Sequence, residues 1–521
     1  MSRPGRTQRI AVDETPLNAA EPNHRARLGW LLAMSRLHHP DESLQDGGRF
    51  ARALGDAGLA ASRSVVSRWE SGLIPVSFDA VTAYEQVLGL EPGRICSIAG
   101  YLRSGWPDGR DRARPRLDPA GPDFGRRLDV LVEAAESGTA SSVEWQELGW
   151  HLAAVPLAYL RADTWQALTR HLVRDLPRTI GIAYRQLSIA ARDLAAVPRA
   201  QDPLVKAISS YISHPAVQVV NNPLDLLDHL PTREAARLVL DVLQRPENFR
   251  AYEMGVWLAR RKAVRGVLTA GELADLQMLV LRSWRSDAAL ASEHLAELIT
   301  DLPEGMRATL VSAAERAGRP RLGYLVEHGE AVEASRARSF ADGLAAAVRA
   351  GAPQEPTYAG DELLPRLLRE SLFHRTTERR HAAALVLCAS PFATPTADVV
   401  LQRLSERDGP GWLRARLATL LRYVSDDSHR LRLLALVNDP DDAVAVPLLQ
   451  TLGHLRLGVT SDGQLRRSLA PDWSPRERAK LYVLGMTGST ALEPLARSVT
   501  APPWQRDAAR WWLQQGKAIR G

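Results

Sequence analysis

The stretch of residues 62–72 (SRSVVSRWESG) constrains the fold and the function of this chain more than any other segment. Serine is favoured at a helix N-terminus and glycine just past a helix C-terminus, so the stretch predicts one short helix. Val66 and Trp69 fall on one face of that helix, and arginine and serine side chains cover the other. Such a helix fits the major groove of DNA, where arginine bonds guanine and serine bonds base edges or phosphate. The alternative is an ordinary amphipathic surface helix.

The flanking sequence predicts four more short helices around this one. Apolar residues at helical spacing, together with capping serine, proline and glycine residues, indicate helices over residues 28–36, 46–55, 77–88 and 92–102. The helix over residues 62–71 is third in this order. Five short helices with an Arg/Ser face on the third are typical of a helix-turn-helix bundle.

Three motifs give this bundle a family likeness. They are L-G-x-x-L-x-x-x-R over residues 28–36, F-A-x-x-L-G over residues 50–55 and V-S-R-W-E-S-G over residues 66–72. With these motifs, residues 27–102 resemble the XRE family of helix-turn-helix regulators, the type of Cro and the phage repressors. The chain departs from the family pattern at residues 56–60 (DAGLA), which widen the turn before the third helix.

The resemblance implies roles for individual side chains. It places five side chains of the third helix at or beside base edges: Arg63, Ser64, Val65, Ser67 and Arg68. It places five residues near phosphates, because helix N-termini present N–H donors to anions: Ser62, Ser71, Gly47, Gly48 and Arg49. It also implies a structural ion pair between Arg36 and Glu70.

The composition of successive segments indicates four regions. Residues 1–23 are polar and contain proline, which predicts a disordered tail, although their arginines could also form an arm in the minor groove. Residues 24–102 form the helix-turn-helix domain. Residues 103–125 are rich in proline, glycine and alternating charges, which is typical of a linker. Residues 126–521 are predicted to form one large helical domain.

This last region shows a loose repeat towards its C-terminus. Helical runs begin near Glu378, Gly411, Asp442, Arg476 and Trp504, with shorter helices between them. A helical hairpin recurring about every thirty residues is typical of a HEAT-like solenoid, in which each hairpin buries its apolar faces against its neighbours. The expected fold is therefore all-α, with an N-terminal five-helix bundle followed by a large HEAT-like solenoid.

Composition limits the cellular setting only loosely. The formal net charge is +6 and the pI is about 9.5, which fits DNA binding without requiring it. Only four of the 66 basic residues are lysine, a bias that suggests a GC-rich bacterial genome. Two cysteines form no disulfide or zinc-ligand pattern, and no apolar run predicts a signal peptide or a membrane span. We expect a cytoplasmic, nucleoid-associated protein without a membrane partner.

The sequence contains no motif of a known active site. G-x-x-x-x-G-K-[ST], H-E-x-x-H, G-x-S-x-G and paired C-x-x-C motifs are missing, and the histidines do not group as metal ligands. We therefore expect no enzyme, no cofactor and no metal. The hypothesis is a sequence-specific transcriptional regulator that reads double-stranded DNA through the helix over residues 62–71. One small module has limited specificity alone, so we expect a homodimer that binds a roughly palindromic operator.

Two alternatives remain open from the sequence. The solenoid could be a protein- or peptide-binding scaffold that the small module recruits to DNA, with a protein, peptide or small-molecule effector on its surface. HEAT-like solenoids also occur in some DNA-repair glycosylases, although no motif here locates a catalytic carboxylate.

Overall fold

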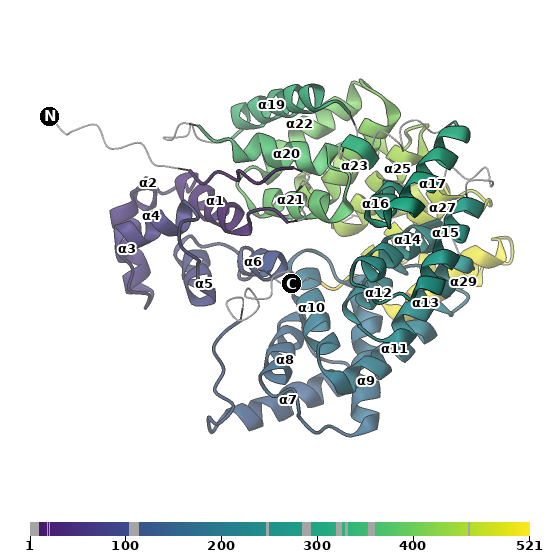
Figure 1. The fold of residues 1–521 in the computed structure, drawn as a ribbon, viewed down its shortest axis with the longest axis horizontal. Coiled ribbons are helices and arrows are strands. Elements are labelled where there is room, and N and C mark those ends of the chain that lie inside the picture. Colours follow the sequence, from purple (N-terminus) through teal and green to yellow (C-terminus); the bar gives the residue numbers. More distant parts are fainter. Residues whose placement is uncertain are drawn as a thin grey trace.

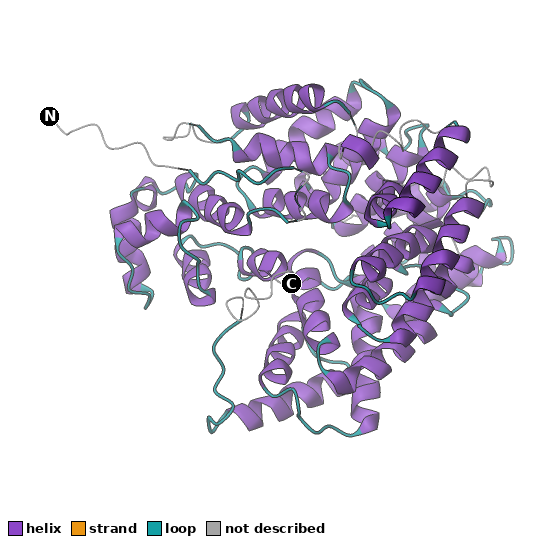
Figure 2. Cartoon of the chain, in the orientation of Figure 1, coloured by secondary structure: helices purple, strands orange, loops and turns teal. Residues whose placement is uncertain are grey.

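The computed structural model describes residues 10–17, 19, 21–103, 114–245, 249–283, 293–318, 326–328, 332–352, 360–456 and 459–520. Within these ranges every regular element is a helix, and the one β-bridge joins Thr179 to Ile519 (Figure 2). The predicted all-α class is therefore confirmed. No single helix in these ranges is long and apolar enough to cross a membrane, and one pair bent by 117° passes that test only when its two helices are taken together.

The N-terminal bundle contains six helices where the sequence predicts five. They are α1 (His24–Leu37), α2 (Glu42–Gln45), α3 (Gly47–Asp56), α4 (Arg63–Glu70), α5 (Phe78–Val87) and α6 (Cys96–Arg103). The additional helix, α2, is a single turn whose first N–H groups are capped by the Asp41 carboxylate. The other five agree with the prediction to within a few residues.

Local capping explains why α4 begins and ends where it does. Ser62 Oγ accepts a hydrogen bond from the Val65 amide at 3.3 Å, which satisfies one of the free N–H groups at the helix start. At the other end, Gly72 adopts a φ of +71°, a left-handed conformation that side chains disfavour. Both features were predicted from residues 62–72.

The α1–α4 crossing depends on two glycines. A Cβ on Gly29 would lie 2.7 Å from the Trp69 carbonyl oxygen, and a Cβ on Gly72 would lie 3.0 Å from the Ala26 Cα. The backbones of α1 and α4 therefore touch with no side chain between them. This close approach presses the apolar rear of α4 against the core of the bundle, where Val66, Phe50 and Tyr84 are buried.

The remaining residues form a curved array of paired helices (Figure 1). Its first half contains α7 (Phe124–Glu136), α8 (Ser142–Ala154), α9 (Ala162–Asp175), η2 (Leu176–Arg178), α10 (Gly181–Ala195), α11 (Pro198–Ile212), α12 (Asn221–Asp225), η3 (Leu226–His229), α13 (Arg233–Gln244), α14 (Phe249–Val264), α15 (Ala270–Ser283), α16 (Glu293–Asp301) and α17 (Glu304–Arg316). Its second half contains α19 (Ala334–Ala350), α20 (Leu363–Phe373), α21 (Thr377–Ala389), α22 (Ala393–Ser405), α23 (Gly411–Val424), η4 (Asp427–His429), α24 (Arg430–Leu436), α25 (Asp442–His454), α26 (Val459–Arg467), α27 (Pro475–Thr487), α28 (Leu492–Arg497) and α29 (Pro503–Gln515).

The repeat predicted near the C-terminus is present. Helices α21, α23, α25, α27 and α29 begin within two residues of the predicted starts and alternate with α22, α24, α26 and α28, of which the last three are shorter. The array curves until its end meets its beginning, where the Ile519 amide donates to the Arg178 carbonyl at 2.8 Å and the Ile180 amide donates to Ile519 at 3.1 Å. The C-terminal segment therefore ends beside η2 and the start of α10.

Two predicted boundaries need correction. The prediction of a disordered tail over residues 1–23 is wrong from residue 10 onward, because Ile10, Ala11 and Asp13 are buried against the array. Residues 1–9 lie outside the described ranges. The linker over residues 103–125 is also shorter than predicted. Arg114 forms an ion pair with Asp193 of α10, and α7 starts at Phe124; residues 104–113 lie outside the described ranges.

Replacing Gly29 with alanine tests the α1–α4 contact. The new Cβ would overlap backbone atoms of α4, which cannot move aside as a side chain can, so we expect Gly29→Ala to lower the free energy of unfolding by about 1–3 kcal/mol. Gly55→Ala in α3 is the control, since nothing lies within 4 Å of the position that its Cβ would take. Alanine there should be neutral or stabilising. Thermal unfolding of both variants measures the difference, and equal midpoints would contradict the contact.

Candidate nucleic-acid interface

The outward face of α4 is free of the rest of the molecule. Arg63, Ser64, Ser67 and Arg68 are exposed and Val65 is half-buried, whereas Val66 and Glu70 on the opposite face are buried. Figure 1 shows α3 and α4 at one edge of the molecule, away from the curved array. The five side chains implied to read bases therefore lie on one accessible helix face.

The guanidinium groups of the two arginines on this face point away from hydrogen-bonding partners. Among the residues that the structure describes, neither the Arg63 nor the Arg68 guanidinium makes a hydrogen bond or an ion pair, although the charge of Arg63 acts on Asp46. The aliphatic part of Arg63 lies over the first turn of α3. Its Cγ is 3.7 Å from the point that a Cβ would occupy if Gly47 had a side chain. Both guanidinium groups are thus available to a ligand, and their planar donors match the O6 and N7 acceptors of guanine.

The structure agrees less well with the phosphate contacts that the family resemblance implies. Asp46 caps α3, and its Oδ1 accepts from the amides of Gly48 at 3.0 Å and Arg49 at 2.9 Å. Its bond from the Arg49 amide lowers the pKa of Asp46, so an anion already occupies this helix N-terminus. The amides of Gly48 and Arg49 are therefore not free for phosphate, which corrects that part of the prediction. The exposed Arg49 side chain remains able to reach the DNA backbone.

The two serines at the ends of α4 also bond within the chain. Ser62 Oγ lies 2.9 Å from Ser64 Oγ, in addition to capping the helix. Ser71 Oγ donates to the Arg68 carbonyl at 3.4 Å and its residue is half-buried. Ser62 is exposed, so its hydroxyl can still contact a phosphate while it caps α4.

A buried ion pair fixes the rear of α4. Arg36 of α1 donates from Nε and Nη2 to the two carboxylate oxygens of Glu70, each at 2.7 Å, and Tyr84 Oη of α5 donates to Glu70 at 3.2 Å. Burial acts to lower the pKa of Arg36, but the hydrogen bonds and the charge of Glu70 outweigh it and the pKa is raised. The pair implied by the family pattern is present, and it ties α4 to α1 and α5.

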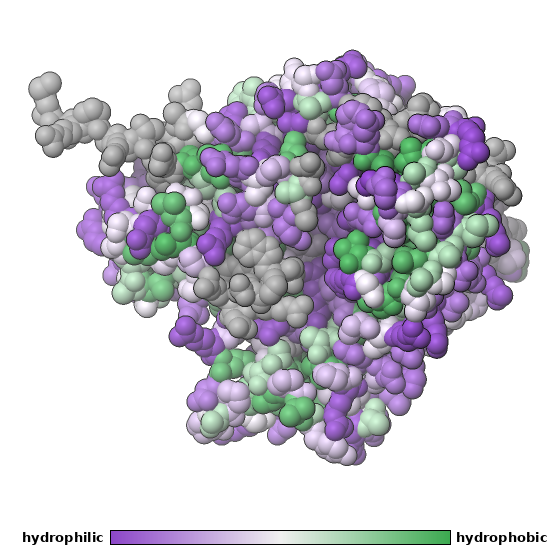
Figure 3. Space-filling view, in the orientation of Figure 1, coloured by the Kyte–Doolittle hydropathy of each residue, from purple (hydrophilic) through white to green (hydrophobic). Residues whose placement is uncertain are grey.

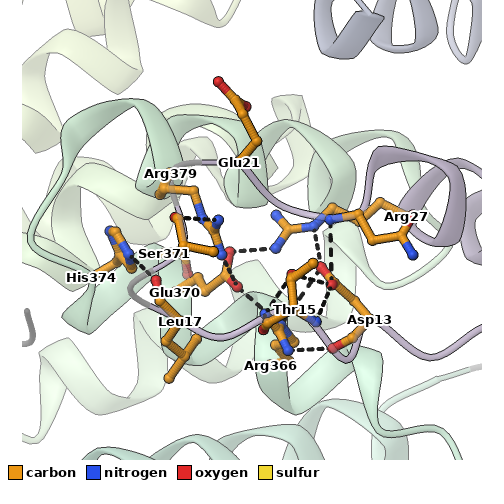
Figure 4. A network of polar contacts seen from close by, with 12 residues as sticks. Asp13, Thr15, Leu17, Glu21, Arg27, Arg366, Glu370, Ser371, His374 and Arg379 are labelled. Atoms are coloured by element: carbon orange, nitrogen blue, oxygen red, sulfur yellow. Dashed lines mark hydrogen bonds and ion pairs between the residues drawn. The ribbon is translucent and has the colours of Figure 1, made fainter. Parts of the chain in front are cut away.

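The bundle is in turn held on the curved array by a second buried charge network (Figure 4). Arg27 of α1 donates to Asp13 at 2.9 Å and to Glu370 of α20 at 2.6 Å, and all three side chains are fully buried. Glu370 also accepts from Arg366 at 3.0 Å and from Arg379 of α21 at 2.9 Å. One carboxylate of the array therefore binds three guanidinium groups, one of which belongs to the bundle.

Residues 10–17, which we name the strap, run through this network. Arg366 donates to the carbonyl oxygens of Asp13 and Thr15. Nε2 of His374 lies 2.7 Å from the Leu17 carbonyl oxygen. Burial lowers the pKa of His374 to about 4, so its ring is neutral at neutral pH. The strap is thus bonded to the array at Asp13, Thr15 and Leu17.

Further contacts on both sides of α1 complete the attachment. Trp30 Nε1 donates to Asp361 at 2.9 Å, and its ring stacks on Phe392 with a centroid distance of 5.9 Å. On the α6 side, Arg185 of α10 donates to Ser97 at 2.6 Å. The bundle therefore does not swing on a tether, and the orientation of α4 is set by the array.

The sequence does not predict this attachment. A signal existed in Arg27 and Trp30, which fall within the apolar face of the first helix, where a charged side chain requires a partner. The partner itself could not be located, since Glu370 lies 343 residues further along the chain. Among the described residues, no group of three or more His, Cys, Asp or Glu side chains is placed to hold a metal ion.

Comparisons with known proteins add little to this description. No family model matches the sequence, and no curated protein matches it either. Among solved structures, the chain is similar to an engineered protein known from a crystal structure, with 13% identity over 75% of this chain and 98% of that one. The TM-score of that match is 0.21, so we draw nothing from it.

Acid titration tests the network that holds the bundle. Burial acts to raise the pKa of Glu370, but Arg27 and Arg379 outweigh it and hold the pKa at about 2, below the ordinary value of 4.5. Because the unfolded chain takes up this proton first, stability is full above pH 4.5 and is lost as the pH falls towards 2. We expect this group alone to remove about 3 kcal/mol over that interval.

Thermal midpoints recorded across that interval measure the effect. Glu370→Gln should lower the midpoint at neutral pH, because three guanidinium groups lose this carboxylate and only Asp13 remains beside Arg27 and Arg366. The same variant should flatten the acid-dependent loss. Glu362→Gln at the exposed start of α20 is the matched control and should behave as the wild type. An unchanged acid profile in Glu370→Gln would show that Glu370 does not carry the network.

Proposed function

We propose that this protein is a sequence-specific DNA-binding transcriptional regulator whose α4 lies in the major groove. The observation that carries the proposal is the contrast between the two faces of α4. Its rear is locked by a buried ion pair, and its front presents two exposed arginines whose guanidinium groups make no hydrogen bond or ion pair in the described structure. A fixed helix that holds unpaired guanidinium groups towards solvent suits direct readout of guanine.

The XRE likeness supports the same proposal. Its three motifs coincide with the structural requirements of the bundle: Gly29 permits the α1–α4 contact, Phe50 fills the core and Gly72 ends α4. The charge pair between Arg36 and Glu70 also joins two of these motifs. We therefore infer membership of the XRE type for the N-terminal bundle, with the cytoplasmic, nucleoid-associated location that a bacterial regulator has.

One α4 per chain favours a dimer on DNA. A module of this size buries about 600–1,000 Å² of protein surface, which gives limited specificity alone. Two copies related by a twofold axis would place their α4 helices about 34 Å apart and read a palindromic operator. Because the bundle is fixed on the array, the spacing between the two α4 helices is set by how the arrays associate.

A scaffold recruited to DNA is the second candidate function. The turn between α8 and α9 exposes Leu157 by 90% and Tyr159 by 79%. Two large exposed side chains of mostly apolar character on one turn of the array favour a protein surface as the partner. The partner is either a second copy or another protein, and size-exclusion chromatography with light scattering separates the two cases.

Substitution of the two free arginines tests the proposed readout. Selection of bound sequences from random duplex DNA first defines the site. Arg63→Ala and Arg68→Ala should each cost about 1–3 kcal/mol of discrimination between that site and random DNA. Arg161→Ala, at an exposed position before α9, is the control. The assignment of α4 is wrong if both variants bind site and random DNA as the wild type does.

A further inference from the structure

A motif of proline and tryptophan recurs where the long helices of the last repeats begin. Pro-x-Trp stands at residues 410–412 at the start of α23, at 471–473 just before α27 and at 502–504 at the start of α29. The corresponding residues at α25, 440–442, have aspartate in place of tryptophan. The helices α27 and α29 are therefore the two consecutive repeats that both carry the tryptophan.

These two consecutive motifs lie side by side in the structure. The rings of Trp473 and Trp504 meet edge to face, with centroids 4.8 Å apart and an angle of 88° between their planes. Trp504 Nε1 donates to the Pro471 carbonyl at 3.1 Å. The side-chain amide of Gln505 donates to the Ala470 carbonyl at 2.5 Å. The turn before α27 and the start of α29 are thereby fixed to each other.

This place is exposed although it is rich in apolar side chains. Trp473 is 53% exposed, and Val499, in the turn that leads to α29, is 91% exposed. Three prolines beside them are also exposed: Pro471, Pro475 and Pro503. Apolar side chains gathered on the surface of a folded chain are typical of a docking site. We name this surface, residues 471–475 and 499–504, the tryptophan patch.

The indole of Trp473 keeps a polar group for a ligand. Trp504 uses its Nε1–H within the chain, whereas no residue that the structure describes accepts a hydrogen bond from Nε1 of Trp473. An exposed indole N–H is a donor suited to a backbone carbonyl. The guanidinium carbon of Arg478 lies 4.9 Å from the centroid of the Trp473 ring, so a positive charge already lies over this ring.

Three arginines around the patch have no carboxylate partner in the part of the chain that the structure describes: Arg466, Arg467 and Arg506. The first two are exposed in the last turn of α26, just before Ala470, which the Gln505 side chain ties to α29. Arg506 donates to carbonyl oxygens at 3.3 and 3.4 Å in the turn that contains Val499. Within the patch, Asp472 is the only acidic side chain. Positive charge therefore exceeds negative charge here, which favours an acidic partner.

We propose that the tryptophan patch docks an extended segment of another protein that is acidic and contains proline. Such a segment adopts the polyproline II conformation, whose carbonyl groups are exposed and whose shape is set before binding. The two perpendicular indole rings form a corner that a proline ring fills, and the Trp473 N–H donates to a carbonyl of the segment. The three arginines pair with its carboxylates.

A single-stranded nucleic acid is the other ligand that aromatic and basic side chains attract. It binds by stacking its bases on open ring faces. Here the two rings are perpendicular, and Arg478 lies over the face of one of them. These contacts leave no two parallel faces for neighbouring bases, so the geometry favours a peptide.

Other apolar side chains reach the surface without these features. Figure 3 shows them among hydrophilic ones over the helices around α14, α15 and α17. Val264 of α14 is 58% exposed and Met278 of α15 is 49% exposed. Neither side chain has a hydrogen-bond donor that would orient a ligand, unlike Trp473. The tryptophan patch is thus the surface where apolar area, a donor and charge occur together.

The patch lies away from the helix proposed to read DNA. Figure 1 shows α27 and α29 on the side of the molecule opposite to α3 and α4. A partner seated on the patch leaves α4 uncovered. Docking of a peptide therefore does not depend on the proposed DNA-binding function, and the two claims can fail separately.

Fluorescence anisotropy of labelled probes with the full-length protein tests the proposal. The probes are an alternating proline–glutamate peptide, a proline–lysine peptide, a serine–glutamate peptide and an oligothymidylate. The proline–glutamate peptide should bind most tightly. Trp473→Ala should weaken it by about tenfold or more, the loss typical of a tryptophan at the centre of an interface. Leu431→Ala, at a 72% exposed position on α24, is the control and should change nothing.

Two further variants separate the contributions to binding. Trp473→Phe keeps a ring but lacks the N–H, so it should retain part of the affinity. Arg466→Glu combined with Arg467→Glu should weaken the proline–glutamate peptide and strengthen the proline–lysine peptide. Because these side chains are exposed, the thermal midpoints should stay close to that of the wild type. The proposal is overturned if the proline–glutamate peptide does not bind, if another probe binds as tightly, or if Trp473→Ala binds it as the wild type does.

Discussion

The arrangement of this protein depends on one buried carboxylate. Glu370 accepts from Arg27, Arg366 and Arg379, and only Arg27 belongs to the N-terminal bundle. Charges buried in this way stabilise little in total, since desolvation offsets most of the attraction, but they penalise any geometry that separates them. The bundle consequently has one orientation on the array. A bundle joined to the array only by the linker that the sequence predicts would have no such fixed orientation.

Helix α1 transmits this fixed orientation to α4. α1 is buried on nearly every side because it serves two cores: Gly29 and Arg36 face α4, and Arg27 and Trp30 face the array. The polar front of α4 is left at the edge of the molecule only because α1 lies between α4 and the array. Whatever moves α20 or α21 relative to its neighbours therefore moves α1, and α4 with it.

The sequence predicted what depends on neighbouring residues and missed what depends on distant ones. Ser62 and Gly72 define α4 through caps within a few residues, and apolar periodicity defines the stacked hairpins, so both could be read from the chain. The strap was predicted to be disordered because the partners that hold its polar residues are far along the chain: Arg366 bonds the carbonyl oxygens of Asp13 and Thr15, in addition to the bond from Arg27 to Asp13. At α3 a local signal was overlooked: Asp46 stands directly before Gly47 and occupies the amides that the family likeness assigned to phosphate.

The network around Glu370 also links the bundle to the later repeats of the array. Its guanidinium groups have carboxylates to bond, so the network holds a fixed geometry. Helix α21 supplies Arg379 to this network, and two residues further on its His381 lies 2.9 Å from the Tyr423 hydroxyl of α23. A shift of α23 relative to α21 would therefore act on the helix that helps to hold α1.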